Sequence, residues 1–308
     1  MGRQLTTGDL QHWRPGRARL VAVDSDGCVF DTVALKQRLC FHPLIVTHWN
    51  LGAIEPLVQE TAEYVNLFSP WRGQNRFLNL LRTFDLLARR ADARATGVVQ
   101  PDTTALRRFV ESGAPLGNPA LEEAARITQD PELARLLAWS VAVDEAVARR
   151  LGALEPFPHV RAGLELIRAE ADIVCVSQTP AATVEREWRA CGLLEYTDGV
   201  AGPELGTKTD HLRALASGYT AGCVLMIGDA PGDMEAAERT GALFYPIHPG
   251  SETEAWQSFG NEAWNRFMSG SFAGAFADDL RARFINSLSQ HPPWEKTAGR
   301  VSASHFAS

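Results

Sequence analysis

The chain has 308 residues, of which 45% are hydrophobic and 22% are charged, and its formal net charge is −7. This length fits one large or two ordinary domains, and the composition is typical of a chain with a substantial buried core. No basic stripe offsets the negative charge, which argues against a nucleic-acid partner. No apolar run approaches the length of a membrane span. The five cysteines form no CxxC pair, which favours a reducing compartment, so we expect a cytoplasmic protein with no membrane segment.

The first strong signal is an apolar run that ends in two acidic residues. Residues 20–23 are typical of a buried parallel strand, and Asp24, Ser25, Asp26 and Gly27 follow at once. Side chains two apart on a strand point the same way. The two carboxylates should therefore project together from the carboxyl end of the strand, where open α/β sheets bind ligands. Two such acids suit attack on phosphorus by one and proton transfer by the other, with a bound Mg²⁺, although the stretch alone also fits an ordinary Asp-Gly turn.

The next part of the chain, residues 32–153, has a helical pattern throughout. Apolar residues recur at helical spacing and predict helices over residues 55–68, 77–88, 106–110 and 130–151. No strand alternation is convincing in this interval. We therefore expect a helical domain at 32–153, inserted into a second domain formed by residues 1–31 and 154–308.

From residue 156 onward helices and strands alternate. Strands are expected at 172–177, 199–201, 223–228 and 242–247, with helices at 159–170, 181–191, 208–217 and 232–240 between them. This alternation predicts an α/β fold with a doubly wound parallel sheet. Two further helices, at 253–268 and 275–289, form a C-terminal extension over 251–290.

Three more polar signals follow the acidic pair along the chain. They are Ser177 at the end of the second strand, Lys208 at the start of a helix, and Gly228-Asp229 with Asp233 after a later strand. Together with the acidic pair, in this order, they resemble the four motifs of the haloacid dehalogenase superfamily of phosphohydrolases. Each is weak alone, but four in order with three at strand ends are a strong signal.

The resemblance implies a Rossmann-type parallel core with an all-helical cap domain. It also implies a Mg²⁺-dependent phosphatase that hydrolyses a small phosphorylated metabolite. In the family, the residue at the position of Asp24 attacks the phosphoryl group and forms an aspartyl-phosphate. Asp26 would then protonate the leaving alcohol and later deprotonate the attacking water. The family's dehalogenases lack an acid at the position of Asp26, so this residue favours phosphoryl transfer over carbon–halogen chemistry.

Three residues are expected to contact the phosphate from the α/β domain. The transferred group carries several negative oxygens, so positioned donors and cations should dominate catalysis. Ser177 offers a hydroxyl at a strand end, beside the amides of an incipient helix, and Lys208 offers a fixed positive charge. Gln178 could contact the substrate through its side chain or its backbone.

A second set of residues, all aspartates, matches the metal ligands of the haloacid dehalogenase superfamily. Mg²⁺ prefers about six oxygen ligands and keeps several waters, so only a few protein oxygens are needed. The resemblance assigns this role to the side chains of Asp24 and Asp229 and the backbone carbonyl of Asp26. Asp233 lies four residues after Asp229, where it is better placed to orient Lys208 or a metal-bound water than to bind the metal directly.

Substrate choice is expected to come from the helical domain. Arg72 and Arg76 are four residues apart beside Trp71, so they could share a helix face toward the phosphate, although a solvated or ion-paired role fits them as well. A phosphomutase and a non-catalytic phospho-ligand-binding regulator are the alternative functions. The expected partner is a small phosphorylated substrate, and the chain is expected to be a monomer or a homodimer.

Overall fold

The computed structural model describes residues 2–150 and 154–295. Contacts divide the chain into two compact units. One, called here the α/β unit, comprises Met1–Val33 and Ala153–Ser287, and the other, the helical unit, comprises Ala34–Gly152 and Leu288–Ser308. Among the described helices, none combines the length and the apolar character that crossing a membrane requires.

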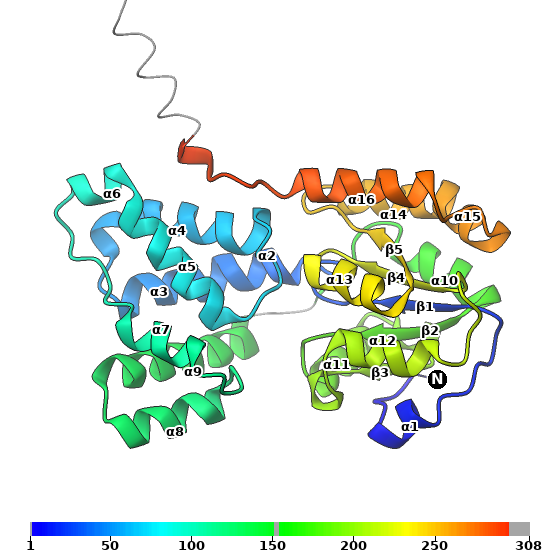
Figure 1. Cartoon of the computed structure of the whole chain (residues 1–308), viewed down its shortest axis with the longest axis horizontal. Coiled ribbons are helices and arrows are strands. Elements are labelled where there is room, and N and C mark those ends of the chain that lie inside the picture. Colours follow the sequence, from blue (N-terminus) through cyan, green and yellow to red (C-terminus); the bar gives the residue numbers. More distant parts are fainter. Residues whose placement is uncertain (1, 151–153, 296–308) are drawn as a thin grey trace, which may run out of the picture. The chain divides into compact units, whose positions relative to one another are not determined.

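The α/β unit contains a five-stranded sheet in which every pairing is parallel (Figure 1). The strands are β1 (Leu20–Val23), β2 (Asp172–Val176), β3 (Gly199–Ala201), β4 (Val224–Gly228) and β5 (Leu243–Pro246), in the order β3-β2-β1-β4-β5. All five predicted strands are confirmed. Val23 pairs with Cys175 on one side and Ile227 on the other, so the residues that follow β1, β2 and β4 emerge at one edge of the sheet.

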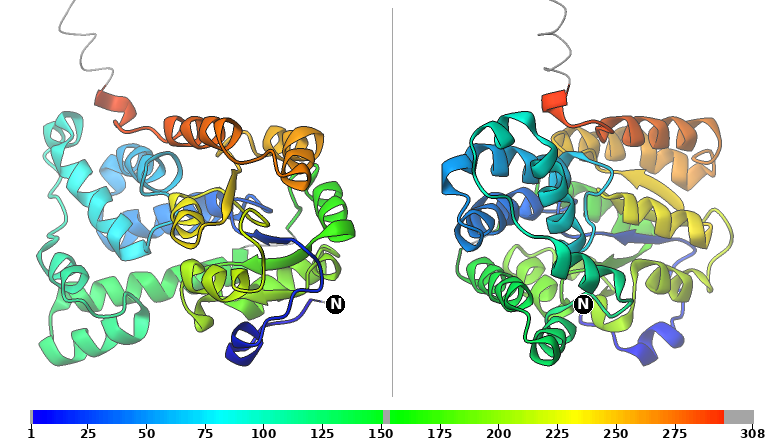
Figure 2. Two further views of the ribbon diagram at one scale, coloured as in Figure 1. Left: turned by 45° about the vertical axis from the view of Figure 1, so that its right-hand side comes forward. Right: turned by 60° about the vertical axis from the view of Figure 1, so that its left-hand side comes forward.

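Both faces of this sheet are covered by helices (Figure 2), which confirms the doubly wound α/β class. Val21 and Val23 pack on one side with α10 (Val160–Glu170), α11 (Ala181–Ala190) and α14 (Glu252–Ser258). Leu20 and Ala22 pack on the other side with α12 (Lys208–Ala216) and α13 (Pro231–Thr240). The alternation of faces along β1 is the two-residue period of a strand, here with both sides apolar because both are buried.

Three further helices complete this unit. They are the N-terminal α1 (Thr7–Gln11), α15 (Trp264–Ser269), which continues α14 through a π-helical turn at Phe259–Ala263, and α16 (Ala275–Ser287). Short 3₁₀ turns lie at Leu194–Tyr196 and Pro203–Leu205. The predicted C-terminal helices therefore form, with one π-helical turn inside the first of them.

The described part of the helical unit contains no strand. Its helices are α2 (Thr32–Lys36), which begins in the α/β unit, α3 (His42–His48), α4 (Glu55–Glu63), α5 (Arg76–Arg89), α6 (Ala91–Ala95), α7 (Thr104–Glu111), α8 (Asn118–Thr128) and α9 (Pro131–Arg150), with π-helical turns at Gln37–Phe41 and Tyr64–Phe68 and a 3₁₀ turn at Gly52–Ile54. Trp139 is the centre of its core and meets Phe41, Trp49 and Phe77 edge-on. Sequence periodicity predicted α4, α5, α7 and α9 but missed α2, α3, α6 and α8.

The segment after α16 packs on the helical unit. The Ser289 amide donates to the Phe68 carbonyl at 2.7 Å, and the Tyr64 hydroxyl donates to the Ser289 carbonyl at 3.0 Å. The Trp294 ring meets Tyr64 edge-on and lies 4.2 Å from the Arg90 guanidinium carbon. This corrects the predicted boundary, which placed residues 288–295 with the α/β domain, because an aromatic and cationic contact between distant residues has no periodic signature. The other predicted boundary, at 153, lies outside the described residues.

Candidate active site

The predicted motif residues of the α/β unit lie at the carboxyl edge of its sheet. The Asp24 amide donates to the Ile227 carbonyl at 2.9 Å and so continues the pairing of β1 with β4 by one residue. The Ser177 amide donates to the Ala201 carbonyl at 3.0 Å and does the same for β2 and β3. Asp229 follows β4 directly. Parallel pairing therefore brings segments about 150 and 50 residues apart in sequence to one edge, as expected for a ligand site of an open α/β sheet.

A tight turn at Gly27 follows the acidic pair. Gly27 has φ of 76°, a left-handed conformation that favours glycine. Its amide donates to the Phe30 carbonyl at 2.8 Å, and the Val29 amide donates to the Ser25 carbonyl at 2.9 Å. These two bonds fold the chain back immediately after Asp26.

Lys208 lies between two of the predicted carboxylates. Its ammonium is 2.7 Å from Asp24 Oδ2 and 2.5 Å from Asp233 Oδ1, and the exposed fractions of the three side chains are 11%, 7% and 0%. Lys208 is held at the start of α12 by a capping box of Thr207 and Asp210. Asp233 in the first turn of α13 also accepts a hydrogen bond from the Ala230 amide at 3.1 Å. This contact is the one expected if Asp233 orients Lys208, and that role stays a prediction.

Asp24, Asp229 and Asp233 form a buried group that fits a metal ion. Each offers a carboxylate oxygen, and these oxygens lie within 4.8 Å of one another. With Lys208 included, the ionised group carries a formal charge of −2. Buried charge of this kind is costly unless a cation neutralises it, and carboxylate oxygens are the ligands of hard cations such as Mg²⁺. The predicted ligation by the Asp26 backbone carbonyl stays a prediction.

The titration of the group reflects this excess of negative charge. Burial raises the pKa of Asp24, and the neighbouring Asp233 and Asp229 raise it further against the opposing effect of Lys208. Burial alone would lower the pKa of Lys208, but the charges of Asp233 and Asp24 raise it above its usual value. Lys208 therefore stays protonated. A bound divalent cation would oppose the rise at Asp24 and favour its ionised form.

Asp26 has a separate set of partners. Thr32 Oγ1 donates to one of its carboxylate oxygens, and Thr179 Oγ1 donates to the other at 2.5 Å. Both hydroxyls belong to the α/β unit. They fix the carboxylate in one orientation. Sequence reasoning missed both threonines; the position of Thr179 two residues after Ser177, past a strand end, is the one signal that pointed to it.

The other two predicted phosphate contacts of this unit differ in exposure. Ser177 is 1% exposed, and its hydroxyl oxygen accepts from the Thr179 amide at 3.0 Å, which leaves its own proton available to a ligand. Gln178 is exposed. Phosphate binding by either residue stays a prediction.

Arg72 and Arg76 both have partners inside the helical unit. Arg72 is 4% exposed and donates to the Leu67 carbonyl at 3.1 Å. Arg76 contacts Asp144 at 2.8 Å and donates to Ser140. Their predicted contact with substrate stays a prediction.

Comparison with known proteins gives structural matches only. No protein-family model matches the chain, and no curated protein is similar to it in sequence. Among solved structures, a haloacid dehalogenase-like hydrolase from Streptococcus pneumoniae aligns with a TM-score of 0.40, 15% identity and coverage of 78% of this chain and 90% of its own. A haloacid dehalogenase-like hydrolase from Xanthomonas campestris aligns with a TM-score of 0.41 and 15% identity, over 76% of this chain and 84% of its own. CbbY from Rhodobacter sphaeroides, in complex with xylulose-1,5-bisphosphate, aligns with a TM-score of 0.39 and 15% identity, over 74% of this chain and 86% of its own.

Proposed function

We propose that the chain is a Mg²⁺-dependent phosphatase that hydrolyses a small phosphorylated metabolite through an aspartyl-phosphate on Asp24. The observation that carries the proposal is the buried Asp24–Lys208–Asp233 contact, with Asp229 beside it and the threonine-held Asp26 two residues after Asp24. This arrangement provides a nucleophile, a fixed cation, a metal-binding group and a separate acid in one place.

The two acids have different roles in the proposed reaction. A carboxylate oxygen of Asp24 forms the new bond to phosphorus while the bond from phosphorus to the substrate oxygen breaks. Asp26 gives its proton to that leaving oxygen. A water then attacks the phosphoryl-aspartate, gives a proton to Asp26, and releases inorganic phosphate with Asp24 free again. The distinct partners of Asp24 and Asp26 support this division, since one contacts a cation and the other contacts two hydroxyls.

The remaining residues bind and neutralise the transferred group. Lys208 can hold a phosphoryl oxygen while it keeps its contact with Asp24, and Ser177 can donate its hydroxyl proton to another. The side chains of Asp24 and Asp229 and the backbone carbonyl of Asp26 would hold Mg²⁺, which when bound supplies positive charge to the phosphoryl oxygens. Asp233 would hold Lys208 beside them. Arg72 and Arg76 are proposed to contact the rest of the substrate.

Replacement of Asp24 by Asn tests the proposal. An amide is a poor nucleophile, so turnover of a panel of phosphorylated sugars, alcohols, acids and nucleotides with Mg²⁺ should fall by ~10⁴-fold or more. Asp172→Asn is the matched control. Asp172 is also buried, at 4% exposed, but it begins β2 and accepts bonds from the Gly16 amide and the Tyr219 hydroxyl at the opposite edge of the sheet. A folded Asp24→Asn protein with near-normal turnover would refute the central step.

Metal removal tests the second part of the proposal. Excess chelator should stop turnover, and added Mg²⁺ should restore it. Asp229→Ala should weaken Mg²⁺ binding by about 10-fold or more in calorimetric titration, since it removes one of three clustered carboxylates. Full activity in excess chelator contradicts the metal requirement while leaving the nucleophile intact.

A further inference from the structure

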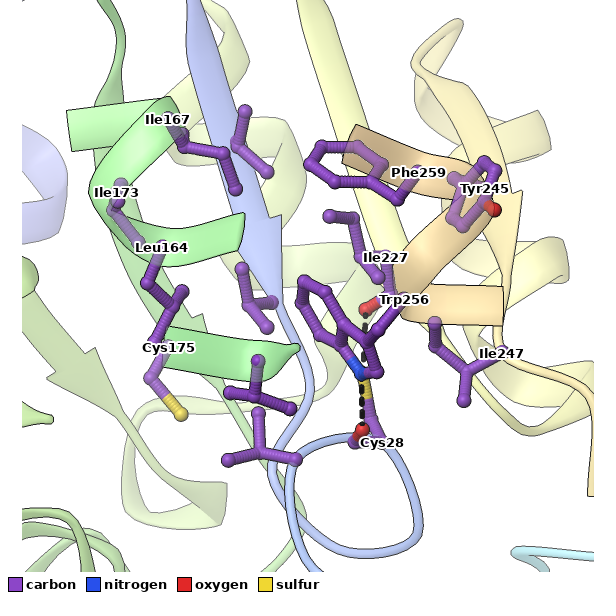
Figure 3. Packing of buried hydrophobic residues seen from close by; sticks show 14 of the residues in the cluster. Cys28, Leu164, Ile167, Ile173, Cys175, Ile227, Tyr245, Ile247, Trp256 and Phe259 are labelled. Atoms are coloured by element: carbon purple, nitrogen blue, oxygen red, sulfur yellow. Dashed lines mark hydrogen bonds between the residues drawn. The ribbon is translucent and has the colours of Figure 1, made fainter. Parts of the chain in front are cut away.

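Two buried tryptophans donate hydrogen bonds to the loop that carries both acids. The Trp188 indole nitrogen donates to Ser25 Oγ at 2.9 Å, and the Trp256 indole nitrogen donates to the Cys28 carbonyl at 2.8 Å. Figure 3 shows the second of these bonds. All four residues are at most 1% exposed, so water does not compete for either bond. The reaction steps described above use neither indole.

The Trp188 contact reaches the loop from behind the acids. Ser25 continues the alternation of Val21 and Val23, whose core cluster includes Trp188. Asp24 instead contacts Lys208, which begins α12 on the other side of the sheet. A donor fixed on the Ser25 hydroxyl restrains the peptide groups on both sides of this residue. The Asp24 carboxylate also accepts the Ser25 amide at 2.7 Å, which couples the position of Ser25 directly to the nucleophile.

The Trp256 contact holds the loop at the far side of the Gly27 turn, and its own position is closely determined. A Cβ on Gly163 of α10 would lie 2.9 Å from two carbons of the Trp256 ring, so only glycine leaves room for it. The Tyr245 hydroxyl donates to the Ala255 carbonyl at 2.7 Å and ties α14 to β5. Phe259 packs edge-on against the same indole. The ring therefore has little freedom to move away from the loop.

We propose that Trp188 and Trp256 are positioning residues for Asp24 and Asp26. Their two indole N–H groups fix the loop at Ser25 and Cys28, one before and one after the Gly27 turn. They so hold Asp24 against repulsion from Asp229 and Asp233 and keep Asp26 within reach of its two threonines. This gives the C-terminal extension a role in the reaction, because α14 supplies Trp256. The inference rests on the proposed phosphatase chemistry.

Trp188→Phe and Ser25→Ala test the first contact from its two ends. Each removes the hydrogen bond but keeps most of the packing. Each should lower kcat by about 10-fold with KM within about 2-fold, because misplacement of a reacting group costs turnover more than binding. The double variant should be no worse than either single variant if both act through this bond. If the two losses in kcat multiply in the double variant, the two residues act separately, and the assignment of this contact is overturned.

Trp256→Phe tests the second contact, and Trp264→Phe is the matched control. Trp264 lies in the same core cluster at 2% exposed, with ring contacts to Phe259 and Phe267. Trp256→Phe should lower kcat by about 10-fold, whereas Trp264→Phe should keep the wild-type kcat even if its melting temperature falls. Gly163→Ala, which displaces the Trp256 ring, should lower kcat as Trp256→Phe does. Equal kcat values in Trp256→Phe, Gly163→Ala and the control would overturn the role of Trp256.

A binding measurement separates this inference from the proposed function. Asp24 belongs to the metal-binding group, so a displaced loop should also weaken Mg²⁺ binding, by about 10-fold in Trp188→Phe and Trp256→Phe but not in Trp264→Phe. If wild-type protein binds Mg²⁺ but hydrolyses no phosphate ester, the proposed function fails and the loss of Mg²⁺ affinity still decides the positioning role. If wild-type protein is active and both tryptophan variants keep kcat and Mg²⁺ affinity, only the positioning role fails.

Discussion

Lys208 in the α/β unit and Arg90 in the helical unit are both buried cations, each paired with two carboxylates. The Lys208 side chain is 11% exposed and contacts Asp24 and Asp233, which are 7% and 0% exposed. The Arg90 side chain is 2% exposed and contacts Glu60 and Asp92, which are 46% and 51% exposed. The cations are alike in burial, but the anions differ.

This difference is the one expected between a reactive site, as we propose for the Lys208 group, and a structural one. Around Arg90 the ionised group carries a formal charge of −1, but its two carboxylates are about half exposed, so water screens that charge. The guanidinium also bonds to Thr61 Oγ1 and stacks with Trp294. Around Lys208 the anions are shielded from water, and a third buried carboxylate, Asp229, leaves the group negative. Buried negative charge that the protein itself does not balance is typical of sites that bind a cation or a reacting group.

Within this comparison, the largest expected effect is on Lys208. Lys208→Met should lower kcat by about 10³-fold, because it removes the fixed positive charge from the transferred phosphoryl group. Steady-state kinetics with saturating Mg²⁺ measure the change, and circular dichroism checks that the protein is folded. A loss smaller than about 10-fold would place the charge stabilisation on other groups and would break the contrast with Arg90.

The corresponding variant of Arg90 should affect stability instead. Arg90→Met removes a hydrogen bond to Thr61 and the contact with Trp294, and it should lower the free energy of unfolding by about 2 kcal/mol. Its two exposed ion pairs contribute little. Urea unfolding measures this loss, while kcat of the folded fraction should stay within about 2-fold of wild type. A large fall in kcat at unchanged stability would assign Arg90 a role in the reaction.

A buried histidine in each unit allows the two to be compared by pH. Burial lowers the pKa of His42 in the helical unit and of His211 in the α/β unit to about 4. Between pH 6.5 and 4 the folded state therefore binds fewer protons than the unfolded chain, and stability falls as pH falls, by about 1.4 kcal/mol per pH unit for each histidine. His42→Gln should remove one of these contributions and His211→Gln the other. A pH dependence of unfolding that neither variant changes would contradict burial as its source.

The smallest predicted effect concerns Arg76. Arg76→Ala should raise KM for the best substrate by less than about 10-fold and leave kcat unchanged, since the residue is proposed to bind rather than react. An aryl phosphate, which offers little beyond the phosphoryl group, should show a smaller change. If KM is unchanged for both substrates, Arg76 has only a structural role, through its contacts with Asp144 and Ser140.

The sequence was most informative where the pattern of apolar residues identified the strands and the parallel order of the sheet determined where those strands end. The apolar runs predicted strands that end at Asp24, Ser177 and Asp229, and parallel pairing places these three strand ends at one edge of the sheet. Helical periodicity likewise predicted α4, α5, α7 and α9 of the helical unit. The parts that could not be predicted are single contacts between distant residues, such as Thr179 with Asp26 and Trp188 with Ser25. A threonine or tryptophan carries no local mark of the partner that it meets after folding.

The docking of Trp294 on Tyr64 and Arg90 also affects how the protein can be re-engineered. The chain passes between its two units three times, near residues 33, 152 and 287. A domain inserted between two points of a chain can be exchanged as one continuous segment, but residues 34–152 of this chain do not include residues 288–295, which contact Tyr64 and Arg90. A graft of that segment onto another core would expose the Tyr64 and Arg90 side chains. The smallest transferable form of the helical unit is therefore two separate pieces of chain, and a successful transplant has to carry both.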